Sequence, residues 1–117
     1  MGAPMVEWPT ETTAAGTVVL RPSGRLNMVA APDLREQLRS LVQSGSARVV
    51  VDLSGVESID SSGLGALISG LKAARNAGGD LRISGPNTQV MAVLELTNLN
   101  RVLKPRESVE KAFDEPD

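Results

Sequence analysis

Residues 48–77 read RVVVDLSGVESIDSSGLGALISGLKAARNA, and this stretch decides the fold class. Its first part, 48–54, is a short apolar run of β-branched residues, which is typical of a strand buried within a sheet. Over residues 62–77 the apolar side chains recur at helical spacing, at Leu64, Leu67, Ile68, Leu71 and Ala74. Two glycines at 78–79 follow as a helix stop. The stretch therefore predicts a buried strand followed by an amphipathic helix.

The alternation of strands and helices extends toward the N-terminus. A hairpin is predicted from a weakly alternating segment at residues 5–8, a turn at Ala15 and Gly16, and a β-branched run at 17–21. Prolines flank the first segment and restrict it to a sheet edge. A helix is expected from about Pro32 to Gly45, because one face carries Leu34, Leu38, Leu41 and Val42.

The same alternation continues toward the C-terminus. We expect a strand at 81–84, a helix capped by Asn87, a last short strand at 100–103 and a helix at 107–113 that buries Val109, Ala112 and Phe113. Residues 114–117 are expected to be a frayed tail. This order predicts a single α/β domain over residues 1–117, with its core at about 5–113. In it, about four helices cover a mixed β-sheet with an N-terminal hairpin.

The composition narrows the possible functions. The chain has 117 residues, the usual length of one domain, and contains no cysteine and no histidine. Thiolate chemistry, the usual zinc ligands and the side chain best suited to proton transfer near neutral pH are thereby excluded. A formal charge of −2 without a basic cluster, and an aromatic content of 2%, argue against a nucleic-acid partner. We expect a protein that is not an enzyme and holds no cofactor or metal.

The sequence also bears on location in the cell. No apolar run approaches the roughly 20 residues that span a bilayer, and the N-terminus lacks a charged region followed by an apolar one. We therefore expect a cytoplasmic protein without direct membrane insertion.

Small and polar residues concentrate at the turn between the two central elements, at Asp60, Ser61, Ser62 and Gly63. A serine hydroxyl can accept from the unpaired amides of the first helical turn, and we assign this cap to Ser62. Gly63 and Gly65 each cost about 1 kcal/mol relative to alanine within a helix, so close approach by another backbone would explain them. A purely structural role, in which the serines and Asp60 cap the helix and the glycines form the turn, explains these residues equally well. The functional interpretation is a phosphoacceptor or a phosphate-binding turn. It is favoured by an exposed hydroxyl, by a helix start that stabilises anions and by clearance around the glycines.

Three segments of the chain resemble a known family. Residues 50–65, VVDLSGVESIDSSGLG, are similar to the signature of STAS-domain anti-sigma factor antagonists, the anti-anti-sigma factors. Residues 24–38, GRLNMVAAPDLREQL, resemble that family's Gly-x-Leu-Asp segment and its following helix. Residues 77–99, AGGDLRISGPNTQVMAVLELTNL, resemble its later strand and helix. The resemblance implies a STAS fold over nearly the whole chain, except the first dozen residues and the tail.

The resemblance also implies a mechanism. In this family the serine directly after the aspartate of the motif is phosphorylated by the anti-sigma factor, a serine kinase that uses ATP, and by position this serine is Ser61. The unmodified protein binds the kinase and frees its sigma factor, whereas the phosphorylated protein is released until a PP2C-type phosphatase restores it. Gly63 and Gly65 would leave room for the kinase. The implied partner-binding residues are Asp60, Ser62, Gly63, Leu64, Gly65 and Asn27.

One position departs from the family pattern. The family often carries aspartate where Asn27 stands, so a partner contact that requires a carboxylate there is open. Asn27 fits equally well as a turn residue before the first helix. Of the other exposed candidates, we interpret Lys72 and Arg75 as solvated cations and Met28 and Met91 as packing residues.

Two alternative functions follow from the same turn. A STAS subunit can dock on a transporter or signalling assembly without ever being phosphorylated. The turn can also be interpreted as the nucleotide-binding loop of a small enzyme, but the G-x-x-x-x-G-K-[ST] pattern and a nearby lysine for the phosphates are missing.

Overall fold

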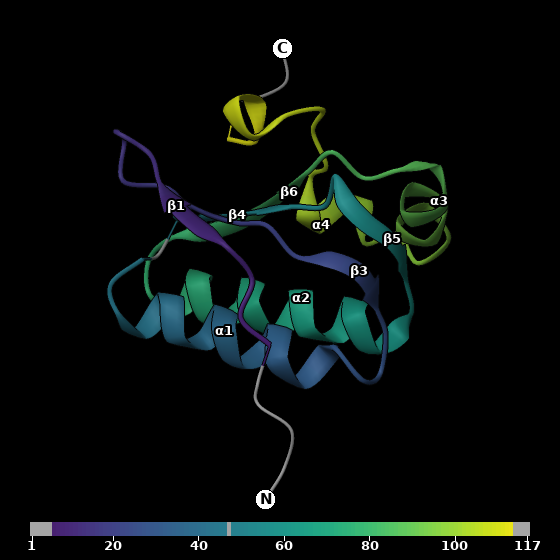
Figure 1. Cartoon of the computed structure of the whole chain (residues 1–117). Coiled ribbons are helices and arrows are strands. Elements are labelled where there is room, and N and C mark those ends of the chain that lie inside the picture. The colour runs from purple at the N-terminus through teal and green to yellow at the C-terminus, as the bar shows by residue number, and fades with distance from the viewer. Residues whose placement is uncertain (1–5, 47, 114–117) are drawn as a thin grey trace, which may run out of the picture.

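The chain alternates strands and helices along its length (Figure 1). The computed structural model describes residues 6–46 and 48–113. Its elements, in chain order, are β1 (Thr10–Thr12), β2 (Val18–Leu20), β3 (Ser23–Leu26), α1 (Ala31–Gln43), β4 (Arg48–Asp52), β5 (Gly55–Ile59), α2 (Ser61–Asn76), β6 (Asp80–Ser84), α3 (Thr88–Leu96), α4 (Asn100–Leu103) and the 3₁₀ turn η1 (Val109–Lys111).

The main sheet is mixed and has the strand order β1-β2-β4-β6. Strand β4 pairs in parallel with β2 on one side and with β6 on the other, while β1 forms an antiparallel hairpin with β2. Strands β3 and β5 form a separate parallel pair. The predicted fold class, the hairpin and the buried central strand are confirmed.

The two faces of the main sheet are covered unequally. Helices α1 and α2 lie side by side on one face, and the segment with η1 lies on the other (Figure 1). Because side chains alternate along a strand, Val49 and Val51 of β4 face the helices, whereas Val50 packs with Val19 and Ala112 under the C-terminal segment. A strand buried on both faces needs a continuous apolar run, which explains the valines at 49–51.

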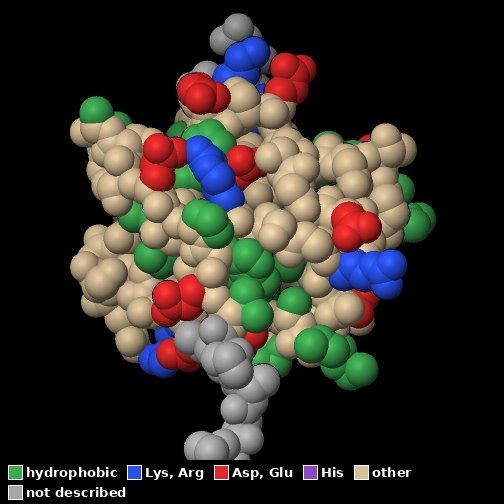
Figure 2. Space-filling view, in the orientation of Figure 1, with side chains coloured by type: hydrophobic (Ala, Val, Ile, Leu, Met, Phe, Trp, Pro, Cys, Tyr) green, Lys and Arg blue, Asp and Glu red, His purple; other side chains and the backbone are tan. Residues whose placement is uncertain are grey.

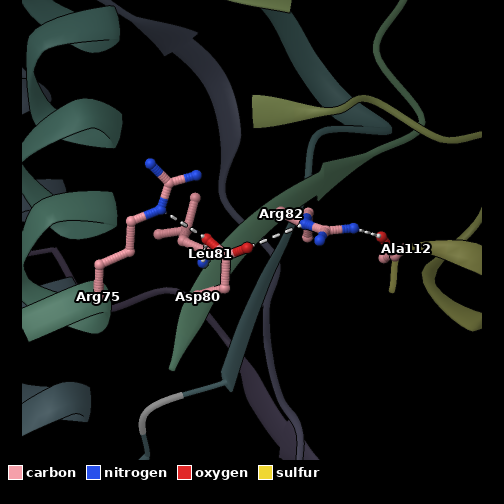
Figure 3. A network of polar contacts seen from close by, with 5 residues as sticks. All are labelled: Arg75, Asp80, Leu81, Arg82 and Ala112. Atoms are coloured by element: carbon pink, nitrogen blue, oxygen red, sulfur yellow. Dashed lines mark hydrogen bonds and ion pairs between the residues drawn. The ribbon is translucent and has the colours of Figure 1, made fainter. Parts of the chain in front are cut away.

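A polar network holds the C-terminal segment on the sheet (Figure 3). The buried Arg82 guanidinium donates from Nε to Asp80 Oδ2 at 3.2 Å and from Nη1 to the carbonyl of Ala112 at 3.3 Å. Arg75 on α2 donates to the other carboxylate oxygen of Asp80, also at 3.2 Å. The guanidinium carbons of Arg82 and Arg48 lie 5.0 and 4.3 Å from the ring centre of Phe113, which is within cation–π range. Asp80 thus links α2, β6 and the chain end.

The start of the chain differs from the prediction. The edge strand lies at Thr10–Thr12, not at residues 5–8, of which Met5 falls outside the described residues. The reason is that Trp8 bonds to a helix instead of a strand: its N–H donates to Gln37 Oε1, and its carbonyl accepts from Gln37 Nε2. Trp8 is thereby buried against α1, and strand pairing begins only after Pro9.

Four further elements differ from the prediction. Residues 100–103 form the one-turn helix α4 and not a strand, since four residues with two apolar side chains do not distinguish the two periodicities. The expected helix at 107–113 is the shorter η1; Ala112 is buried as expected, whereas Val109 and Phe113 are only half-buried. The parallel pair of β3 and β5 was not predicted, because both strands are short and polar on their exposed side.

Candidate functional site

Strands β3 and β5 place two loops next to each other. Leu26 at the end of β3 is paired with Ile59 at the end of β5, and the N–H of Asp60 donates to the carbonyl of Leu26 at 3.2 Å. The loop that starts at Asn27 and the turn that starts at Asp60 therefore leave the same edge of this pair. This parallel register brings Asn27 and the serine turn together.

Asp60, and not Ser62, caps helix α2. Its Oδ1 accepts hydrogen bonds from the backbone N–H groups of Ser62 at 2.9 Å and Gly63 at 3.1 Å. Aspartate is among the best residues at this position, and the negative charge also suits the positive end of the helix dipole. The prediction of Ser62 as the cap was wrong by two positions, because both serines already belong to the helix.

Ser61 is the first residue of α2, and its side chain is exposed. Its hydroxyl forms no hydrogen bond with any residue that the structure describes. The neighbouring Ser62 is half-buried. Of the two serines, Ser61 therefore presents the more accessible nucleophilic oxygen, on a backbone that the Asp60 cap holds in place.

A contact within the chain itself requires glycine at position 63. A Cβ atom there would collide with the carbonyl oxygen of Leu26 and would lie 2.8 Å from Ile59 Cγ1, so only glycine lets α2 approach the β3–β5 pair. The expected close approach of a backbone is thus correct, but this backbone belongs to the chain itself. The idea that Gly63 leaves room for a kinase is corrected accordingly. Leu64 is only 4% exposed and belongs to the core.

A groove of about 510 Å³ begins at Ser61 and follows one face of α2. Gly65, half-buried, lies on its floor, and a Cβ there would be 3.7 Å from the Nη2 of Arg35, which is an ordinary contact. The residues that line the groove are Arg35, Ser61, Leu64, Gly65, Ile68, Ser69, Lys72, Thr97 and Leu99. A larger hollow of about 670 Å³, between the β6–α3 loop and the C-terminal segment, contains none of the predicted site residues.

Asn27 has a structural role in its own loop. Its Oδ1 accepts from the N–H groups of Val29 at 3.0 Å and Ala30 at 3.2 Å, directly before α1. The interpretation as a turn residue is confirmed. The next two side chains point outward: Met28 is 73% and Val29 81% exposed, so the expectation that Met28 packs in the core was wrong.

The sequence reasoning missed several surface residues near the turn. Leu96 at the end of α3 is 85% exposed, and the groove beside it is lined by Thr97 and Leu99. Arg35 was not among the predicted site residues. No sequence signal distinguishes it from other exposed arginines, because its position over Gly65 depends on how α1 and α2 pack. Exposed apolar residues beside a groove are typical of protein–protein contact surfaces.

The described residues show no features of a metal site or a membrane-spanning helix, and one face of the molecule shows no basic binding surface (Figure 2). Within residues 6–46 and 48–113, no group of three or more acidic side chains is placed to hold a metal ion. No helix in this part of the chain is long and apolar enough to cross a bilayer. On the face shown in Figure 2, Lys and Arg side chains are scattered and lie beside Asp or Glu side chains, without a continuous basic surface.

Comparisons with known proteins identify the family. The pattern described as "Mlab, STAS domain" matches residues 10–105. A Thermotoga maritima protein named for a proposed role as an anti-sigma factor antagonist is 34% identical over 84% of this chain and 88% of its own length. The anti-sigma-B factor antagonist of Staphylococcus aureus is 31% identical over 74% of this chain and 81% of its own length. A crystal structure of the T. maritima protein superposes with a TM-score of 0.84, at 31% identity and 92% coverage of each chain. The chain belongs to the STAS domain family.

Proposed function

We propose that this protein is an anti-sigma factor antagonist that works by partner switching. In its unmodified form it binds an anti-sigma factor serine kinase and so releases a sigma factor. Phosphorylation of Ser61 ends that binding, and a PP2C-type phosphatase restores it. The names of the relatives support the antagonist role. The observation that carries the switch is the exposed Ser61 hydroxyl, which has no hydrogen bond to the described residues and directly follows the helix cap Asp60.

The surface around Ser61 has the properties of a reversible binding site. The exposed side chains of Met28 and Val29 lie in the loop next to the serine turn, and they offer apolar area to a partner. Phosphate would add about −1.5 to −2 charges at Ser61, next to the carboxylate of Asp60. Because the Asp60 cap and the β3–β5 pair already fix the backbone, this charge would weaken binding without refolding the domain.

The chain would supply only the acceptor in the phosphoryl transfer. The Ser61 oxygen attacks the γ-phosphorus of ATP held by the kinase, ADP leaves, and the hydroxyl proton passes to a base. The sequence contains no histidine, and the nearest carboxylate, Asp60, already accepts two amide hydrogen bonds. The base and the nucleotide site therefore belong to the kinase, and the protein itself is neither an enzyme nor a cofactor carrier. This role requires a cytoplasmic location, where sigma factors act.

The test uses anti-sigma factor kinases encoded in the same genome. Each is incubated with ATP and the protein, and the modified residue is located by mass spectrometry; we expect phosphate on Ser61. In pull-downs, Ser61→Ala should bind the kinase whether or not ATP is present, and Ser61→Asp should bind at least severalfold more weakly. Ser62→Ala is the matched control and should behave like the unmodified protein.

Two outcomes would contradict the proposal. Phosphate on another residue would remove Ser61 as the acceptor. Equal binding by Ser61→Ala and Ser61→Asp, together with co-purification of membrane transport components instead of a soluble kinase, would favour a docking subunit that is never phosphorylated.

A further inference from the structure

Arg35 reaches from α1 across to the face of α2 that carries Ser61. Ser61 and Gly65 are separated by one helical turn, so their side-chain positions are about 5–6 Å apart on the same face. The Nη2 of Arg35 lies 3.7 Å from the position that a Cβ on Gly65 would occupy. Both Arg35 and Ser61 line the same groove. A group that extends from the Ser61 oxygen along the groove therefore comes within reach of this guanidinium.

The charge of Arg35 is not neutralised by the part of the chain that the structure describes. Arg35 has no ion pair or hydrogen bond there, and neither has Lys72, which lines the groove further along α2. Other arginines on the surface are paired, such as Arg39 with Glu36 and Arg21 with Asp52. The groove thus carries two cations and is lined by no carboxylate.

Two of the backbone amides at the start of α2 are already occupied and do not compete with these side chains for an anion at Ser61. The amides of Ser62 and Gly63, which point out of the helix start, already donate to Asp60. Asp60 itself repels an anion. The connection between α3 and α4 lines the groove with Thr97 and Leu99, which carry no charge. The charged groups that face Ser61 are therefore Asp60, Arg35 and, more distantly, Lys72.

We propose that Arg35 binds the phosphoryl group of phosphorylated Ser61 within the same chain, while Lys72 contributes at longer range. The planar guanidinium can donate two parallel hydrogen bonds to phosphate oxygens, which an ammonium cannot match. Gly65 keeps the space between the two side chains open. This inference depends on the proposed function only in assuming that Ser61 carries phosphate. It has a consequence for the switch: in the phosphorylated form Arg35 is no longer available to a carboxylate of the partner.

The test installs phosphoserine at position 61 during translation, so no kinase is required. The ionisation of the phosphate is followed by ³¹P NMR against pH at low salt. In Arg35→Gln, the midpoint of the titration should move up by about half a pH unit, because the dianion loses its counter-charge. Arg39→Gln removes an exposed arginine from the same helix outside the groove and should leave the midpoint unchanged. Lys72→Gln should move it in the same direction by less.

The result separates this inference from the proposed function. Equal midpoints in the phosphorylated protein and its Arg35→Gln variant would overturn the Arg35 site, as would an equal shift in Arg39→Gln, which would indicate a general charge effect. An Arg35→Lys variant with a midpoint between those of arginine and glutamine would support it. Failure of every kinase to modify Ser61 would contradict the proposed function, but it would not change these titrations.

Discussion

The backbone carbonyl of Leu26 occupies the space in which a side chain of Gly63 would lie. This contact joins α2 to the β3–β5 pair at the base of the serine turn. We expect Gly63→Ala to lower the free energy of unfolding by about 1–3 kcal/mol, despite alanine's better helix propensity, because the carbonyl belongs to a paired strand and cannot move aside cheaply. Urea unfolding followed by circular dichroism measures the loss.

Gly65→Ala is the matched control for this substitution. It lies two residues further along the same helix, and the added methyl group would meet only the flexible end of Arg35 at 3.7 Å. We expect stability to stay the same or to rise by up to about 1 kcal/mol, as alanine favours the helix. A loss as large as that of Gly63→Ala would show that the contact with Leu26 is not the cause.

Asp60→Ala removes the cap of α2. We expect a loss of about 1 kcal/mol in the free energy of unfolding, because the amides of Ser62 and Gly63 lose their acceptor. Ser62→Ala should change stability by less than about 0.5 kcal/mol, since its hydroxyl has no hydrogen bond to the described residues. If the two variants lost equal stability, the assignment of the cap to Asp60 would be wrong.

Asn27→Asp tests the departure from the family pattern. A carboxylate can accept from the amides of Val29 and Ala30 as the present side chain does, so stability should change by less than about 1 kcal/mol. Asn27→Ala, which removes the acceptor, should cost about 1 kcal/mol. With the fold preserved in Asn27→Asp, any change in kinase affinity reports on the partner contact itself. Thermal unfolding and a binding titration on the same samples separate the two effects.

Asp80 gives the stability a pH dependence. Partial burial raises the pKa of its carboxyl. The N–H of Leu81 and the guanidinium groups of Arg75 and Arg82 together lower this pKa by a larger amount, so that it lies below the ordinary value. A lowered pKa in the folded state means that the carboxylate stabilises the fold above the unfolded-state pKa of about 4, and that this stabilisation is lost as the pH falls through the folded-state pKa.

The variant Asp80→Asn isolates this contribution. At pH 7 we expect it to be about 1–2 kcal/mol less stable than the unmodified protein, because Arg75 and the buried Arg82 lose a charged acceptor. The difference should shrink as the pH is lowered below about 4. Unfolding curves measured at several pH values check this, and a difference that stays constant down to pH 2 would show that the ionisation of the Asp80 carboxyl is not its source.

The long periodic segments of the fold could be predicted from the sequence. The valine run of β4 and the apolar stripe of α2 have only one plausible periodicity each, and their predicted bounds lie within two residues of the observed ones. Short segments could not be assigned in this way. Residues 100–103 and the strands β3 and β5 take their conformation from their neighbours, and Trp8 is held by the side chain of Gln37 far along the chain.

The site was predictable to a similar extent. The position of the serine turn at a strand-to-helix junction follows from local sequence, and the resemblance to a family points to one of its serines. The roles of individual residues depend on tertiary contacts. Asp60 is the cap because the helix already begins at Ser61, and Gly63 is required by a carbonyl from a distant strand. The position of Arg35 depends on the packing of two helices.

Strands β3 and β5 end side by side, but the two turns that follow them keep separate hydrogen bonds. Asn27 secures its own loop, and Asp60 secures the start of α2. Substitutions at Met28 and Val29 can therefore alter the surface beside the serine turn while Ser61 keeps its backbone geometry. Under the proposed function, two copies of such a protein that differ only in this loop would be expected to prefer different kinases while sharing the same way of presenting Ser61.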